Sequence, residues 1–217
     1  MLQRLFGSSG QSGLVESAFE EFSAMLRHAA EMLDLALAAL LDNADLEVDL
    51  DQMDDRIDDG ESKIRRMVLQ HLSLSPNKDL VASLVLISMV QDAERIGDFA
   101  RGLGDLPALA KSPRGGPFAE ELGQISDRVR PLFQTCEKAF RDDDADLAQR
   151  VVDQHPQIKA DLSDYIRRLA DSDLDADMAI VYASTARILQ RVSAHLSNIA
   201  STVVQPFDKI RHDDEDG

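Results

Sequence analysis

Cysteine and tryptophan are almost missing from this sequence of 217 residues, which has one cysteine and no tryptophan. A single thiol excludes an internal disulfide, a Cys-x-x-Cys metal pair and a redox dithiol. Cys136 lies between Phe133 and Phe140 at helical spacing, a pattern that favours burial over reactivity. We therefore predict that Cys136 is a small core residue.

Long apolar runs are also absent. The longest, Leu35–Leu41 and the serine-interrupted Leu80–Val90, are much shorter than the roughly 20 residues that a membrane-spanning helix requires. The first seven residues carry one basic side chain and too short an apolar run for a secretory signal. We expect a cytoplasmic protein that does not cross a bilayer.

Basic residues are few, 23 against 40 acidic ones, and the formal net charge is −17. Such a charge repels nucleic acid phosphates and acidic lipid surfaces at long range, so we expect no nucleic acid partner. A basic protein segment or a cation is a better electrostatic match. The segment 42–61 is the most acidic, with ten carboxylates and Arg56 as its one basic residue.

Catalytic signatures are missing as well. The sequence has no GxxxxGK[ST] loop, no GxSxG elbow and no HExxH motif. It also lacks the Glu-x-x-His motif of di-metal oxidases built on helical bundles. No residue is marked as a nucleophile, and we expect that the protein is not an enzyme.

Apolar residues recur at helical spacing along almost the whole chain, for example at Phe19, Phe22, Leu26 and Leu33, and no period-two pattern competes. This periodicity predicts an all-α protein. Pro131 and Pro156 fall inside predicted helices, and we expect each to kink or interrupt its helix. The expected helices cover about 15–41, 45–71, 79–106, 118–141, 144–169 and 175–204.

The two halves of the chain resemble each other. Segment 92–100 aligns with segment 188–196, so that Arg95 matches Arg191 and Ile96 matches Val192. We predict two tandem antiparallel three-helix bundles from a duplicated unit. The predicted organisation is a flexible N-terminus (1–13), a first bundle (14–106), a linker (107–117), a second bundle (118–205) and an acidic tail (206–217).

Four carboxylates on two predicted helices of the first half can lie at the same level along the bundle axis. Glu94 and Asp98 are four residues apart, as are Asp54 and Asp58, so each pair projects from one helical face. If the two helices are antiparallel across the turn at 72–78, the pairs lie level. Like charges this close need solvent, protons or a cation, and a hard divalent or trivalent metal ion is a natural partner. A plain solvated outer face would have the same residues, and spacing alone leaves both interpretations open.

Segment 92–100, Asp-Ala-Glu-Arg-Ile-Gly-Asp-Phe-Ala, resembles the signature of the PhoU family of phosphate-signalling proteins. Glu94-x-x-x-Asp98 matches the E/D-x-x-x-D motif with which that family holds metal ions on its bundles. Asp54 and Asp58, with Glu61, resemble the acidic segment of the preceding helix. The resemblance implies two three-helix bundles and a metal site made by these five residues, with iron, zinc, manganese or magnesium as candidate ions.

The second half departs from this motif, because Gln190 and Ala194 stand where the family has carboxylates. His155 and Lys159 align with Asp54 and Asp58, and a lysine ammonium repels a cation. We therefore expect one metal site of the family type. Whether Asp153, His155 and His195 form a weak site of another kind is left open.

The resemblance also implies a function. It indicates a cytoplasmic regulator of phosphate uptake and phosphate-responsive signalling that works by protein contact. Its expected partners are a phosphate transporter and a sensor histidine kinase, with membrane association only through them; a homodimer is left open. The alternatives are a metal-dependent enzyme that uses the 54/58/94/98 carboxylates and a metal-free helical adaptor.

Overall fold

The computed structural model describes residues 13–76 and 78–205, which form α-helices, one short 3-10 helix and no strand. The predicted acidic tail, and all of the predicted flexible N-terminus except Gly13, lie outside the described residues. Gly13 already belongs to the first helix. The elements are α2 (Gly13–Leu41), α3 (Leu50–Leu74), α4 (Leu80–Asp105), η1 (Leu106–Leu109), α5 (Pro117–Asp142), α6 (Ala145–Ala170) and α7 (Ala176–Val204).

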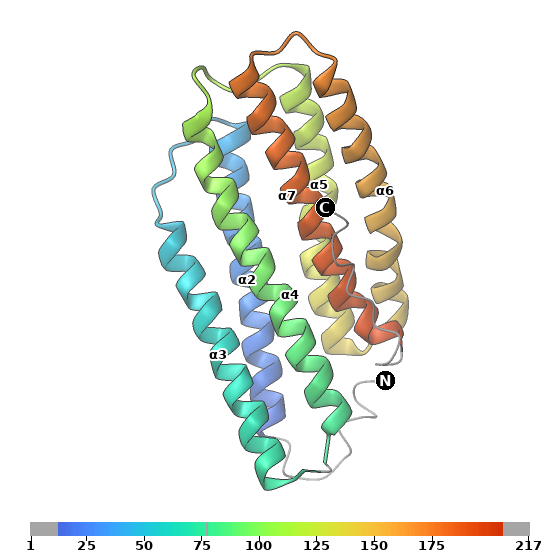
Figure 1. Cartoon of the computed structure of the whole chain (residues 1–217). Helices are drawn as coiled ribbons and strands as arrows, with labels where there is room; N and C mark the ends of the chain where they lie inside the picture. The colour runs from blue at the N-terminus through green and yellow to red at the C-terminus, as the bar shows by residue number, and fades with distance from the viewer. Residues whose placement is uncertain (1–12, 77, 206–217) are drawn as a thin grey trace.

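The six α-helices form two antiparallel three-helix bundles, α2–α4 and α5–α7, which lie side by side (Figure 1). This confirms the predicted all-α, tandem-bundle fold. Helices α3 and α6 lie on the outside of the pair, whereas α4 packs on α7 and α2 packs on α5. The buried apolar residues of both bundles make one continuous core. The bundles are therefore held against each other as well as joined by the chain.

Aromatic rings and ion pairs connect the bundles along the α2–α5 contact. The Phe140 ring lies 4.9 Å from that of Phe19 and 5.4 Å from that of Phe22, centroid to centroid. Arg130 Nε lies 3.0 Å from Asp34 Oδ1 at the edge of this contact. Tilted aromatic pairs at such distances are favourable beyond the area they bury.

The segment between the bundles is tied to the end of α2 by Arg114. Its guanidinium donates hydrogen bonds to the carbonyl oxygens of Ala39 (2.6 Å) and Leu40 (3.0 Å). The Arg114 amide donates to the Asn43 side chain, which donates back to the Arg114 carbonyl, both at 2.8 Å. Carbonyl groups in the last turn of a helix have no hydrogen-bond donor within the helix. Arg114 therefore supplies donors to two such carbonyl groups of α2.

Pro131 and Pro156 lie inside α5 and α6, and neither helix is interrupted. Of the two expected outcomes, a kink or an interruption, the interruption does not occur. A proline removes one helical hydrogen bond, but buried residues on both sides of each proline hold the helix against its bundle. Tertiary packing outweighs the local preference here.

Cys136 is buried on α5, and its thiol lies 3.6 Å from the Leu196 carbonyl oxygen. Burial raises the pKa of the thiol far above its usual value. This confirms the prediction that Cys136 is a small core residue. Within residues 13–76 and 78–205, no helix is long and apolar enough to span a membrane.

Candidate functional site

Helices α3 and α4 approach each other closely where the predicted carboxylates lie. A Cβ atom on Gly97 of α4 would stand 2.7 Å from Ile57 Cδ1 and 3.0 Å from Asp54 Oδ1, both on α3. A larger residue at 97 would hold the helices apart. The absent side chain therefore lets Asp54 lie against α4, where Asp54 is 8% exposed.

Arg101 connects the two helices within this acidic cluster. Its Nε donates to Asp54 Oδ2 at 2.7 Å and its Nη2 donates to Asp98 Oδ1 at 3.4 Å. Arg95 Nη1 donates to the other Asp98 oxygen at 3.2 Å. Sequence reasoning missed Arg101, although its position one helical turn after Asp98 placed it on the same face.

The carboxylates remain close enough to repel one another. Burial is the main cause that raises the pKa of Asp54, and the charges of Asp98 and Asp58 add to it while Arg101 lowers it. Burial and Asp98 likewise raise the pKa of Asp58. The pKa of Glu94 is raised by burial and by Asp98, with smaller contributions from Glu61 and Asp58. All five predicted residues thus share one electrostatic neighbourhood, and the arginines leave an excess of negative charge.

The described carboxylates do not already surround a common point. Among the described residues, no group of three or more His, Cys, Asp or Glu side chains is arranged to hold a metal ion. The Arg101 guanidinium bonds to both Asp54 and Asp98. Glu61 forms an ion pair with Arg65, whose Nη2 lies 2.7 Å from Glu61 Oε1. The oxygen donors suit a hard cation in type, whereas their present geometry suits a guanidinium.

Both bundles match one family model. The PhoU domain model matches residues 22–105, which span most of α2 and all of α3 and α4, and again residues 122–203 in α5–α7. Together the two matches cover well over half of the chain. The chain belongs to the PhoU family.

Known PhoU proteins resemble the chain over most of its length. It is 27% identical over 193 residues to the phosphate-specific transport system accessory protein PhoU homolog 1 of Thermotoga maritima, covering 85% of this chain and 83% of that protein. The crystal structure of PhoU from Pseudomonas aeruginosa superposes with a TM-score of 0.80 at 25% identity, covering 90% of this chain and 97% of that one. The phosphate transport system regulatory protein PhoU from Streptococcus pneumoniae, at 20% identity and a TM-score of 0.78, shares the fold and covers 92% and 97% of the two chains.

The second PhoU repeat has different chemistry at the corresponding place. Ile57 and Ile158, which the sequence alignment pairs, are both fully buried, and so Asp54 corresponds to the buried His155. His155 Nδ1 lies 2.9 Å from Ser193 Oγ. A His155–Ser193 hydrogen bond thus stands where the first repeat has the Asp54–Arg101 ion pair.

The three residues considered for a weak second site have separate partners. His155 contacts Ser193, Asp153 accepts a hydrogen bond from Gln149 Nε2 at 2.8 Å, and His195 contacts Asp92 of the first bundle at 2.8 Å. Asp92 also accepts from Asn198 Nδ2 at 3.2 Å. In the second PhoU repeat His155 therefore serves packing and His195 the contact between bundles, whereas Asp153 is exposed and bonds within α6.

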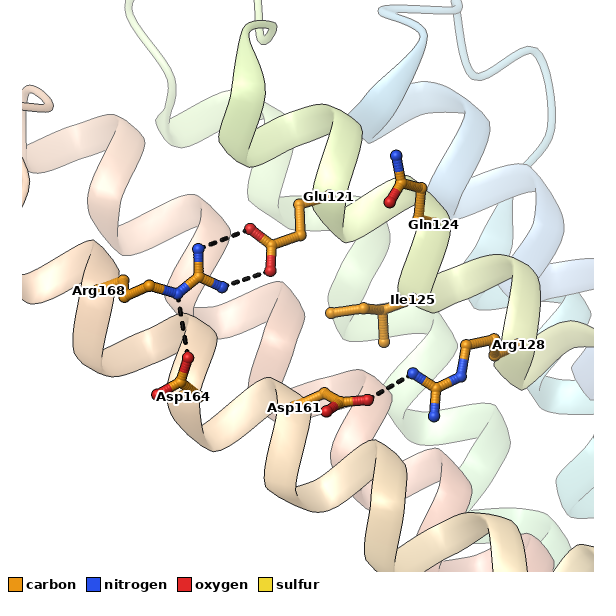
Figure 2. A pocket seen from close by; sticks show the side chains of 7 residues that line it. All are labelled: Glu121, Gln124, Ile125, Arg128, Asp161, Asp164 and Arg168. Atoms are coloured by element: carbon orange, nitrogen blue, oxygen red, sulfur yellow. Dashed lines mark hydrogen bonds and ion pairs between the residues drawn. The ribbon is translucent and has the colours of Figure 1, made fainter.

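A cleft of about 290 Å³ lies between α5 and α6 (Figure 2). Arg168 forms a forked pair with Glu121 and donates to Asp164 Oδ2 at 3.1 Å, while Arg128 pairs with Asp161. Both arginines thus already have carboxylate partners. An anion that entered this cleft would have to displace them, and the cleft does not form an anion site in this arrangement.

Proposed function

We propose that this PhoU-family protein is a cytoplasmic regulator of phosphate uptake that acts by contact and catalyses no reaction. The observation that carries the proposal is the pair of PhoU-domain matches over both bundles. The Thermotoga maritima relative bears the name of an accessory protein of a phosphate-specific transport system. A phosphate transporter and a sensor histidine kinase are the partners we propose.

The acidic α3–α4 face is our candidate for the contact surface. Its carboxylates carry more charge than Arg95 and Arg101 neutralise, and burial together with the neighbouring carboxylates raises the pKa of Asp54, Asp58 and Glu94. Such a face accelerates encounter with a basic segment of a partner. Steering of this kind weakens with salt, because the screening length falls to about 8 Å at physiological ionic strength. Exposed ion pairs contribute only about 0–1 kcal/mol each, so apolar contacts must supply most of the affinity.

We also propose that this face binds a hard divalent or trivalent cation. Asp54, Asp58, Glu61, Glu94 and Asp98 would hold it, since all five offer only carboxylate oxygens and share one neighbourhood. Arg101 competes for the same oxygens through its bonds to Asp54 and Asp98. The guanidinium must therefore move aside when a cation binds. The net charge of the α3–α4 face then depends on whether the cation is bound.

Metal content and thermal stability test the cation proposal. Asp98→Asn removes a proposed ligand and is expected to lower both the metal content and the stabilisation that added metal produces. Arg101→Gln removes the competitor and is expected to raise metal affinity. Asp164→Asn is the matched control, because it removes a carboxylate that also pairs with arginines but lies in the second bundle. Equal metal content in wild type and Asp98→Asn would contradict these ligands, and no bound metal in any variant would favour the metal-free adaptor.

Deletion in the host tests the regulatory function. We expect phosphate uptake and phosphate-responsive transcription to change when the gene is removed. Pull-down of membrane partners should be stronger at low salt than at high salt. Unchanged uptake and transcription would favour an adaptor with another role, and metal-dependent turnover of a phosphoester by pure protein would favour the enzyme.

A further inference from the structure

Four helices form one layer of the molecule (Figure 1). Helix α3 packs on α4, α4 on α7 and α7 on α6, whereas α2 and α5 lie behind this layer. Because α4 and α7 are antiparallel, a half-turn about an axis through the layer places the outer helices of one bundle on those of the other. Phe99 and His195, which the sequence alignment pairs, lie at this internal axis, since their rings are 5.5 Å apart. The α3–α4 and α6–α7 faces therefore occupy equivalent places on one side of the molecule.

The charge of the two faces is opposite. Five acidic residues of the α3–α4 face align with residues that are not acidic in the second repeat; the aligned pairs are Asp51–Val152, Asp54–His155, Asp58–Lys159, Glu94–Gln190 and Asp98–Ala194. In the same alignment Arg187 stands where the first repeat has Gln91, and Arg191 where it has Arg95. We define the α6–α7 face by its cations Lys159, Arg187 and Arg191. On the α3–α4 face the five carboxylates and Glu61 outnumber the arginines Arg65, Arg95 and Arg101.

The three cations lie on the outer surface of the layer. Lys159 follows His155, which bonds to Ser193 of α7, by four residues, so Lys159 lies on the side of α6 next to α7. Arg187 and Arg191 are likewise four residues apart on α7. All three side chains are exposed, and Lys159 forms no ion pair with another described residue. Their charge is therefore available to a partner.

The acidic residues of the second bundle lie away from these cations. Asp177, the one acidic residue of α7, accepts a hydrogen bond from the Lys111 amide at 2.8 Å. At 3.6 residues per turn, the acidic residues of α6 point about 120–160° away from Lys159; they are Asp146, Asp153, Asp161 and Asp164. The α6–α7 loop with its aspartates begins about 18 Å along the helices from Lys159 and from Arg187, beyond the screening length of about 8 Å. The α6–α7 face is therefore locally basic on an acidic protein.

A second copy of the chain matches both faces at once. A two-fold axis in the plane of the layer, perpendicular to the line that joins the two faces, places each α3–α4 face on the α6–α7 face of the other copy. The complementary contact then occurs twice in one closed dimer. A basic segment of another protein would cover the α3–α4 face alone and leave the α6–α7 cations without a partner.

The layer is large enough for such an interface. The 26 residues of α4 span about 39 Å at about 1.5 Å per residue, and four helices spaced by about 9 Å span roughly 27 Å, which gives a surface of roughly 1,000 Å². A stable interface takes about 800 Å² from each partner. Leu84 and Ile180, which the alignment pairs, are 41% and 55% exposed and lie two helical turns before Gln91 and Arg187. They add apolar contacts, which the ion pairs need because each exposed pair contributes only about 0–1 kcal/mol.

We infer that the protein forms a two-fold dimer in which the acidic α3–α4 face of each copy packs on the basic α6–α7 face of the other. This contact goes beyond the proposed function, because it requires neither a transporter nor a kinase. The acidic face is also our candidate surface for other proteins, so dimer formation and partner binding exclude each other. The charge of −17 on each copy opposes encounter, and we expect a dimer that dissociates on dilution.

Mixing two charge-reversal variants tests the inference. Light scattering and sedimentation of full-length protein, from about 1 μM to 0.3 mM and with a chelator to exclude metal bridges, should show wild type reaching twice its 23.9 kDa mass. The double variants Lys159→Glu, Arg187→Glu and Asp58→Lys, Glu94→Lys should each dissociate at least about tenfold more readily, because like charges then face each other. An equimolar mixture of the two should recover a dimer, since the reversed faces are again complementary.

The matched control is Lys138→Glu, Arg150→Glu. It makes the same change of charge at two exposed cations of the second bundle, on α5 and on the side of α6 opposite Lys159, and should dimerise like wild type. Helical circular dichroism checks that every variant folds.

Four results would overturn the inference. They are a wild type that stays monomeric over the whole series, equal loss in the control, a mixture of the reversed variants that stays monomeric, and growth of wild type beyond a dimer. The last would show open head-to-tail contacts instead of a closed pair. Because the measurement uses pure protein, its failure leaves the proposed regulation of phosphate uptake standing.

Discussion

His195 Nδ1 lies 2.8 Å from Asp92 Oδ1, across the contact between α7 of one bundle and α4 of the other. Asp92 is 5% exposed and also accepts a hydrogen bond from Asn198 Nδ2. The His195 ring in turn lies 5.5 Å from that of Phe99, which carries the Arg191 guanidinium 5.4 Å above it. A buried carboxylate with partners on the opposite helix fixes how the bundles align, because any slip would leave that charge unpaired.

Loss of Asp92 should loosen the contact between the bundles. We predict that Asp92→Ala lowers the free energy of unfolding by about 2–4 kcal/mol, since it leaves buried donors on α7 without their acceptor. A double-mutant cycle with His195→Ala should give a coupling energy of about 0.5–3 kcal/mol. Denaturant unfolding measures both values, and Asp45→Ala at an exposed loop position is the control. Additive effects of the two changes would contradict the pairing.

The acidic α3–α4 face should make stability depend on pH in a particular direction. Raised pKa values at Asp54, Asp58 and Glu94 mean that the folded protein binds protons more readily there than the unfolded chain does. Stability from these groups is therefore greatest at low pH and is lost as pH rises through their folded-state pKa values. We predict that metal-free protein melts at a higher temperature at pH 5 than at pH 7. The double variant Asp58→Asn, Glu94→Gln should show a smaller difference in melting temperature between the two pH values. Glu20→Gln, on the exposed side of α2, should show the same difference as wild type.

Gly97 should resist replacement although it lies inside a helix. Alanine is favoured over glycine in helices by about 1 kcal/mol, but a Cβ at 97 meets Ile57 Cδ1 at 2.7 Å, and overpacking costs about 1–3 kcal/mol. We predict a net loss of about 1 kcal/mol for Gly97→Ala. Gly102→Ala on the same helix, where a Cβ meets nothing within 4 Å, should stabilise by up to about 1 kcal/mol. Thermal melts of the two variants that shift in the same direction would contradict the close α3–α4 approach.

Arg114 should contribute more to the free energy of unfolding than an exposed arginine does. We predict that Arg114→Ala costs about 1–2 kcal/mol, because the carbonyls of Ala39 and Leu40 lose their donors. Arg167→Ala, which removes an exposed arginine bonded to Asp164, should cost less than about 1 kcal/mol. Chemical denaturation would show the difference between the two arginines. Equal effects would mean that the carbonyl contacts contribute little.

Local periodicity was sufficient to predict the helices and the bundle fold, because every bundle helix buries an apolar stripe at helical spacing. The predicted ends lie within a few residues of the observed ones, as at Asp144, which caps α6. The continuous core between the bundles was not predicted. It depends on side chains such as Phe140 and Asp92, which meet partners more than 100 residues away, and no local pattern encodes such contacts.

Within the candidate site, spacing predicted which carboxylates share a face but not what balances their charge. Arg101 and Asp54 are 47 residues apart and come together only because Gly97 lets α3 and α4 approach. The metal ligands stay a prediction for the same reason. Arg101 and a cation compete for the same carboxylates. The spacing of residues along the chain does not give the difference in free energy between the two interactions.

Complementation of the deletion in its host tests the central claim most directly. Three genes would be supplied: wild type, the double variant Glu94→Gln, Asp98→Asn on the α3–α4 face, and the double variant Asp161→Asn, Asp164→Asn on the second bundle. Phosphate uptake and phosphate-responsive transcription would be recorded at equal protein levels. Our account predicts that wild type and the second-bundle variant restore regulation and that the α3–α4 variant does not. Full restoration by the α3–α4 variant would contradict the assignment of regulation to this acidic face.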